Sequence, residues 1–136
     1  IRIIMATYNK FQPAIESLFE GINSGSDSWV IKLATAVNQA AGTITEVANG
    51  NGYTTGGNAA STTSASQTGG TFKLVLASPT AWTASGAGFT FQYAILTDST
   101  TSTNVAYWDY GSSQAVAAGE TVTVTLDGTN GVFQAT

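Results

Sequence analysis

The chain has 136 residues, of which 9% are charged, and its formal net charge is −4. It contains no histidine and no cysteine, which excludes an imidazole base, a thiolate nucleophile or zinc ligand, and a disulfide. Its four basic residues form no cluster, and no apolar run approaches the ~20 residues that a membrane helix needs. We therefore expect one domain over residues 1–136, with no cofactor, no metal, no nucleic-acid contact and no membrane contact.

The first four residues precede what reads as an ordinary translation start at Met5. They are Ile, Arg, Ile and Ile, a segment that is too short for a signal peptide and lacks its cleavage pattern. We interpret residues 1–4 as a translated leader and Met5 as the start, which the intact mass of the native protein would test.

Residues from about 9 to 22 carry the only helical pattern in the chain. Pro13 is tolerated in a first turn, so the regular helix is expected to begin near Gln12 and to end at Gly21. The polar face carries Glu16 and Glu20. The apolar face is a candidate interface, which either covers one end of the β-core or docks on a partner, and it consists of Phe11, Ile15, Leu18, Phe19 and Ile22.

Everything after Ser28 has the pattern of short strands and turns. Apolar and polar residues alternate in several segments, and the clearest alternation runs over residues 121–126. Seven to nine short strands predict a mainly β fold, either a β-sandwich or a barrel, with one N-terminal amphipathic helix. The expected inward residues are Ile31, Leu33, Leu74, Leu76, Phe91, Tyr93, Val122, Val124 and Leu126.

No motif in the sequence indicates catalysis. The glycine-rich loop over residues 50–58 lacks the Lys-Ser/Thr of a phosphate-binding loop and is expected to be a β-connection. The carboxylates show no spacing that pairs two of them for glycoside chemistry, and no serine or threonine has a base beside it. Asp127-Gly128 is typical of a turn. We therefore expect a protein that is not an enzyme.

Aromatic residues supply the other candidate interface positions. Trp29 is expected in the core, whereas Trp82 stands among Ser, Ala and Thr residues near Pro79 and is expected to be partly exposed. Exposed rings could stack on sugars, although rings in a small β-domain more often pack inside it. The candidate interface residues of this group are Tyr53, Trp82, Trp108 and Tyr110.

Several segments, in this order, resemble a small protein family common among the virion structural genes of tailed bacteriophages. The resemblance covers nearly the whole chain from Met5 onward, and the glycine-tyrosine-threonine loop is its most specific part. The family has no catalytic residue to carry over. The matching segments are Met5 to Phe11, Ile44 to Val47, Gly50 to Gly57, Gly70 to Val75, Phe91 to Leu96, and Trp108 to Gly111.

The resemblance implies a component of the virion, and physical arguments narrow its position. An acidic protein would be repelled by packaged DNA, which disfavours the capsid interior. A small, β-rich chain of low charge fits a capsid decoration or cement protein on the head exterior. Its partners would be the major capsid protein and copies of itself, as a homo-oligomer in the particle. The alternative is a structural or host-carbohydrate-binding module associated with the tail or a fibre.

Overall fold

The computed structural model describes residues 6–136, and this part of the chain is mainly β with one helix, as predicted. The interpretation of residues 1–4 as a leader lies outside the described residues. Several strands are only two or three residues long. In chain order the elements are β1 (Thr7–Lys10), α1 (Gln12–Glu20), β2 (Trp29–Asn38), β3 (Thr43–Glu46), β4 (Asn58–Ala59), β5 (Thr62–Thr68), β6 (Thr71–Leu76), β7 (Trp82–Thr83), β8 (Phe89–Asp98), β9 (Thr103–Val116), β10 (Thr121–Val122) and β11 (Phe133–Ala135).

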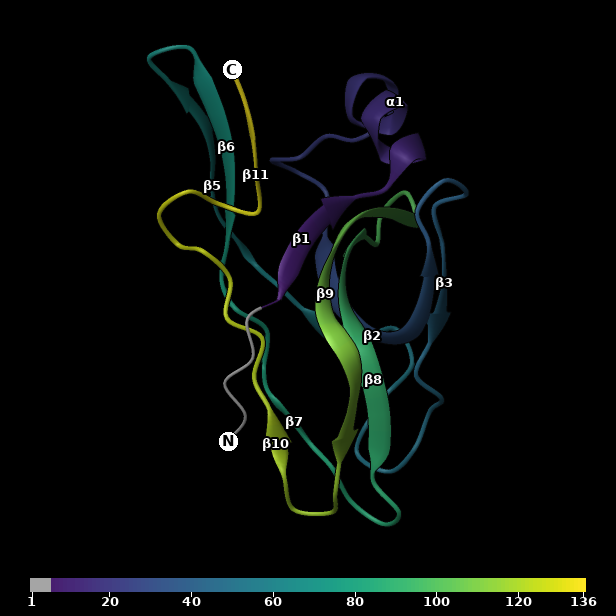
Figure 1. Cartoon of the computed structure of the whole chain (residues 1–136). Helices are drawn as coiled ribbons and strands as arrows, with labels where there is room; N and C mark the ends of the chain where they lie inside the picture. The colour runs from purple at the N-terminus through teal and green to yellow at the C-terminus, as the bar shows by residue number, and fades with distance from the viewer. Residues whose placement is uncertain (1–5) are drawn as a thin grey trace.

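The strands form one large antiparallel sheet and two small ones (Figure 1). The large sheet has the order β1-β9-β8-β2-β3, and β4 also pairs with β2. A second sheet has the order β11-β6-β5, and β7 pairs with β10. The layers meet through side chains such as Trp29 and Phe133, whose ring centroids are 6.1 Å apart. The arrangement is sandwich-like, and no closed barrel forms among the described strands.

The large sheet bends back on itself at the hairpin of β2 and β3. The pairing of these strands shifts between Ala34 and Ala36, which is the irregularity that lets a strand turn sharply. The hairpin is held in place at its tip, where Asn104 Nδ2 donates to the Gly42 carbonyl at 3.0 Å and the Gln12 N–H donates to the Gln39 carbonyl at 3.0 Å. Residues 94–98 of β8 are consequently buried on both faces of the sheet.

Most of the predicted inward residues lie in the core. Ile31, Leu33, Leu74, Leu76, Phe91, Val124 and Leu126 are buried. Tyr93 and Val122 are only half-buried, but they pack against this core as the alternation predicts. The prediction for Trp29 is confirmed, whereas Trp82 is 3% exposed and not the partly exposed residue that its neighbours suggest.

The strand predicted over residues 121–126 is regular only at Thr121 and Val122. Continuing its register with β7 would bring Thr125 opposite Pro79, which has no backbone N–H to donate. The Leu126 N–H donates instead to the Ser78 hydroxyl at 2.9 Å. Val124 and Leu126 still point inward, so the alternation predicted the face correctly although the ladder stops.

The helix is shorter than the predicted span of about 9–22, because residues up to Lys10 belong to β1. Its start at Gln12 is as expected. No helix in the described part of the chain combines the length and the apolar character that crossing a membrane requires.

Candidate functional site

Helix α1 is fixed at its start and leaves most of its surface uncovered. Phe11 is its N-cap residue with extended backbone, and it is fully buried against Tyr107, with ring centroids 4.9 Å apart. The Phe11 N–H donates to the Val105 carbonyl at 3.1 Å, which continues the pairing of β1 with β9 into the helix. Within the helix only Ala14 is buried. The helix is therefore anchored to the β-core at its N-terminal end and exposed along most of its length.

One side of α1 borders an apolar groove of about 400 Å³. The groove lies between the helix, β1 and β11. Phe19 is 88% exposed and Ile15 is 45% exposed, and they are the large apolar side chains that the described residues leave open to solvent. Lys10 is the one charged residue among those that line it. The lining residues are Tyr8, Lys10, Ile15, Leu18, Phe19, Ser24, Phe72, Val105, Phe133, Gln134 and Ala135.

A second groove of about 360 Å³ lies beside the first and shares Tyr8 and Phe133 with it. Tyr8 contacts Trp108 edge to face, with ring centroids 5.5 Å apart, and burial raises the pKa of Tyr8 to about 12. Asp127 also lines this groove. Hydrogen bonds from Asn130 and from the Thr129 N–H lower the pKa of the Asp127 carboxyl, because they favour its charged form.

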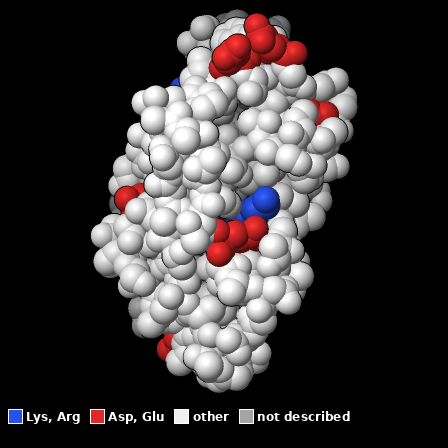
Figure 2. All heavy atoms as spheres, turned by 90° about the vertical axis from the view of Figure 1, so that its right-hand side faces the viewer, with Lys and Arg blue, Asp and Glu red and all other residues white. Residues whose placement is uncertain are grey.

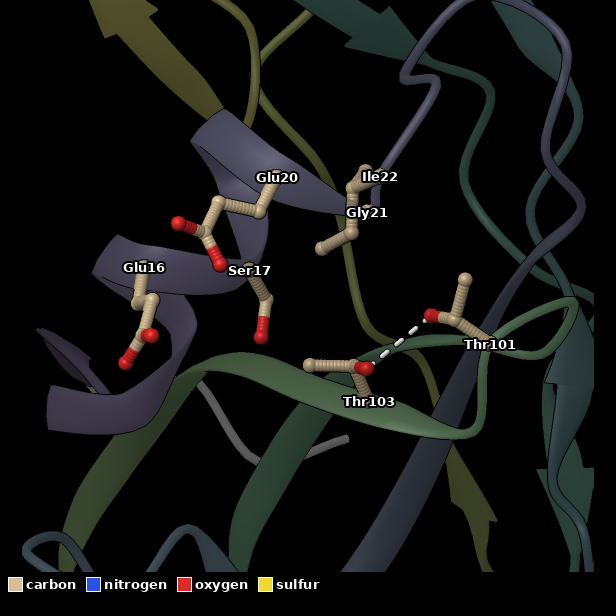
Figure 3. Close-up of a pocket in the computed structure, with 7 residues that line it drawn as sticks. All are labelled: Glu16, Ser17, Glu20, Gly21, Ile22, Thr101 and Thr103. Atoms are coloured by element: carbon tan, nitrogen blue, oxygen red, sulfur yellow. Dashed lines mark hydrogen bonds between the residues drawn. The ribbon is translucent and has the colours of Figure 1, made fainter.

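The opposite side of α1 is acidic. Glu16, Ser17 and Glu20 line a pocket of about 260 Å³ together with Thr101 and Thr103, and Figure 3 shows the Ser17 side chain pointing toward Thr103. Charged atoms are sparse on the face of the molecule drawn in Figure 2, where carboxylates gather at the α1 end. The helix thus presents an apolar side and an acidic side, and the two sides border different cavities.

The predicted interface residues of the helix fall into three groups. Phe11 is fully buried, so it is a core residue and not part of a contact surface. Leu18 and Ile22 are half-buried. Ile15 and Phe19 are exposed, and they border the apolar groove with Leu18. The helical pattern placed Phe11 and Phe19 on one face. The helix begins only at Gln12, however, so Phe11 precedes it and lies in the core, whereas Phe19 lies at the rim of the groove.

Tyr53 is 2% exposed, so its prediction as a contact residue is wrong. Its hydroxyl accepts from the Leu33 N–H at 3.1 Å and donates to Glu46 Oε1 at 2.6 Å. Leu33 lies where the edge of β2 passes from β3 to β4, so the hydroxyl serves a backbone N–H between two strand partners. Burial, then the hydrogen bond with Glu46, raises the pKa of Tyr53. Gly57 has φ of 74° and lies so close to the Ile31 carbonyl oxygen that a Cβ would clash.

The remaining aromatic predictions are divided. Trp82 stacks near Tyr53 inside the core, with ring centroids 6.3 Å apart, and is therefore not a contact residue. Tyr110 is half-buried with its ring edge-on to Phe91, and burial raises its pKa. Trp108 is half-buried in the wall of the second groove. Of the aromatic predictions, Trp108 alone lines either groove.

Three aromatic residues of the apolar groove were not among the candidates: Tyr8, Phe72 and Phe133. Tyr8 lies just before the helical pattern, and Phe72 and Phe133 alternate in short strands like ordinary core residues. The sequence gives no signal that these three come together. Their contact depends on the pairing of β1 with β9 and of β11 with β6.

Within residues 6–136 no three side chains of the metal-binding types come together as a potential metal site. Comparisons with protein-family models, with curated proteins and with solved structures found no match for this chain.

Proposed function

We propose that this chain is a non-enzymatic structural protein of tailed-bacteriophage particles, and that it binds its neighbours through the apolar groove beside α1. The observation that carries the proposal is the exposure of Phe19 and Ile15 at the rim of a groove with a single charged lining residue. An uncovered apolar patch is a common mark of a protein–protein contact. The resemblance to phage virion proteins supplies the kind of particle.

Within such a particle, we favour a decoration or cement protein on the capsid exterior. The net charge of −4 disfavours contact with packaged DNA. Its partners would be the major capsid protein and copies of itself. Many modest contacts across a lattice of subunits would add by multivalency, so heads would bind the protein much more tightly than free shell subunits do. Since the groove holds few charges, this binding should survive high salt.

The test uses purified protein and heads that lack it. Heads incubated with the protein should take it up and should release DNA at a higher temperature than untreated heads. Phe19→Ser should reduce the uptake, whereas Glu16→Gln, on the acidic side of the same helix, should bind like the parent. Heads that take up no protein and leak DNA at an unchanged temperature would contradict the proposal.

The alternative is a tail- or fibre-associated module that binds host carbohydrate. The second groove favours it, because Asp127 and the half-buried Trp108 both line it. A ring and a carboxylate are groups that bind the apolar face and the hydroxyls of a sugar. A change of tryptophan fluorescence on titration with host surface glycans, abolished by Trp108→Ala, would support this alternative over the cement function.

A further inference from the structure

A pair of carboxyl groups lies beneath the acidic side of α1. Asp98 ends strand β8 and is 0% exposed. Its Oδ1 accepts from the Thr100 N–H at 2.8 Å and from the Thr101 N–H at 3.2 Å. Its other oxygen, Oδ2, is buried and has no donor among the described residues. An ionised carboxylate with a buried unpaired oxygen is costly, so this atom needs an explanation.

The neighbour of Asp98 is a second carboxyl group. Asp27 lies in the loop between α1 and β2, and its side chain lies within hydrogen-bonding reach of Asp98. Asp27 Oδ2 already accepts from the Asn23 N–H at 2.7 Å. Two ionised carboxylates offer only acceptors to each other, so a hydrogen bond between them requires that one carry a proton.

No described lysine supplies a positive charge to replace that proton. The three described lysines lie on β1, β2 and β6, and none of them is a hydrogen-bond partner of either carboxyl group. From α1, Glu16 and Glu20 line the same pocket as Thr101 of the turn after Asp98. From β2 the residue opposite Asp98 is Trp29, which does not titrate, and from β9 it is Thr103. Among the described residues, the titratable groups contributed by these elements are therefore acidic.

We propose that Asp98 holds a proton in the folded protein and donates it from Oδ2 to the Asp27 carboxylate. This carboxyl–carboxylate pair joins a buried Asp98 to a half-buried Asp27, and it fastens the loop of residues 23–28 to the turn of residues 99–102. Asp98 Oδ2 then gains a partner, while Asp98 Oδ1 keeps its two N–H donors and Asp27 Oδ2 keeps the one from Asn23.

The environment acts in the same direction. Burial raises the pKa of the Asp98 carboxyl, and the hydrogen bond with Asp27 raises it further, against the opposing effect of hydrogen bonds from the Thr101 N–H, the Thr101 side chain and the Thr100 N–H. A group whose pKa is higher in the folded state binds more protons there than in the unfolded chain. The stability it contributes is complete below the unfolded pKa of about 4 and is lost as the pH rises through the folded pKa. The pair thus stabilises the folded protein more at low pH than at high pH.

The decisive variant is Asp98→Asn. The amide keeps an oxygen for the Thr100 and Thr101 N–H groups and supplies a permanent N–H donor for Asp27, so it mimics the protonated acid. The parent should melt at progressively lower temperature as the pH rises from 4.5 to the folded pKa, by up to a tenfold loss in the folding equilibrium per pH unit, and this loss should level off above the folded pKa. Asp98→Asn should melt like the parent at the acidic end and higher at the basic end.

Asp127→Asn is the matched control, because it makes the same chemical change at an exposed carboxylate whose pKa is lowered. It should gain nothing at high pH. An Asp98→Asn variant that melts at or below the parent at every pH overturns the proposal. A second outcome also overturns the proposal: at pH 8, millimolar calcium chloride raises the melting temperature of the parent but not that of Asp98→Asn, which would show that the pair is a cation site.

A direct measurement covers the case in which the variant does not fold. Carboxyl ¹³C chemical shifts of the folded parent should show one aspartate that stays protonated well above the ordinary aspartate pKa. If every aspartate titrates at or below the ordinary value, the proton site does not exist. The inference does not depend on the proposed function, since each of these readings is made on the isolated protein.

Discussion

Strand β8 and helix α1 differ in how far their apolar residues are buried within the chain. Residues 94–98 of β8 are buried on both faces, between the bent sheet and the second layer. Helix α1 buries only Ala14, although its sequence carries as clear an apolar pattern as any strand. The difference shows that an apolar pattern identifies a surface whose burial is favourable. The pattern does not indicate whether the chain itself buries that surface. In β8 the cover is intramolecular, whereas in α1 the chain itself leaves Ile15 and Phe19 exposed.

The largest loss of stability is expected from a charge placed in the buried part of β8. Leu96→Asp should unfold the protein, because an unpaired buried carboxylate costs several kcal/mol, comparable with a typical total stability of ~5–15 kcal/mol. Far-UV circular dichroism during thermal melting would measure the loss. Thr90→Asp, at an exposed position of the same strand, should melt close to the parent. A Leu96→Asp variant as stable as the parent would contradict the burial of both faces.

A smaller effect is expected where a side chain serves the backbone. Tyr53→Phe keeps the ring in the core but leaves the Leu33 N–H without its acceptor, which should cost about 1–3 kcal/mol in urea unfolding. Glu46→Gln is the control, because its side-chain oxygen can still accept from the Tyr53 hydroxyl and the Gly56 N–H. If Tyr53→Phe is as stable as the parent, the hydroxyl does not support the edge of β2.

The smallest effect on stability is expected from a substitution at an exposed position of α1. Phe19→Ser should change the free energy of unfolding by no more than about 0.5 kcal/mol, since the ring is 88% exposed. It should, however, weaken association measured by sedimentation at high protein concentration. A large loss of stability would show that the ring packs on its own chain, and the proposed contact surface would then be wrong.

The sequence predicted those features that depend on local pattern. Alternation identified the inward face of β2 and β6, and Pro13 located the start of the helix. It even predicted the facing of Val124, where no regular strand forms. What it missed depends on residues far apart in the chain. Asp27 meets Asp98 only because β2 pairs with β8, and the burial of Trp82 comes from its packing near Tyr53.

The candidate surface shows the same division. The periodicity of residues 11–22 named Ile15, Leu18 and Phe19, which do border the groove. It also named Phe11, because a helical period carries no information on where the chain leaves the core. The other wall of the groove, with Phe72 and Phe133, comes from the C-terminal sheet and has no local signature.

The pairing of β1 with β9 also sets an order of events in the life of the chain. Thr7 pairs with Asp109, so β1 finds its partner strand only after the chain has been made as far as β9. Until then the contacts of β1 and α1 with Gln39, at the β2–β3 hairpin, are formed without that strand, and closing so long a loop slows folding, typically to the millisecond-to-second range for such β topologies. A newly made molecule therefore passes through a period in which β1 has no strand partner, and a chain truncated before β9 cannot pair β1 at all.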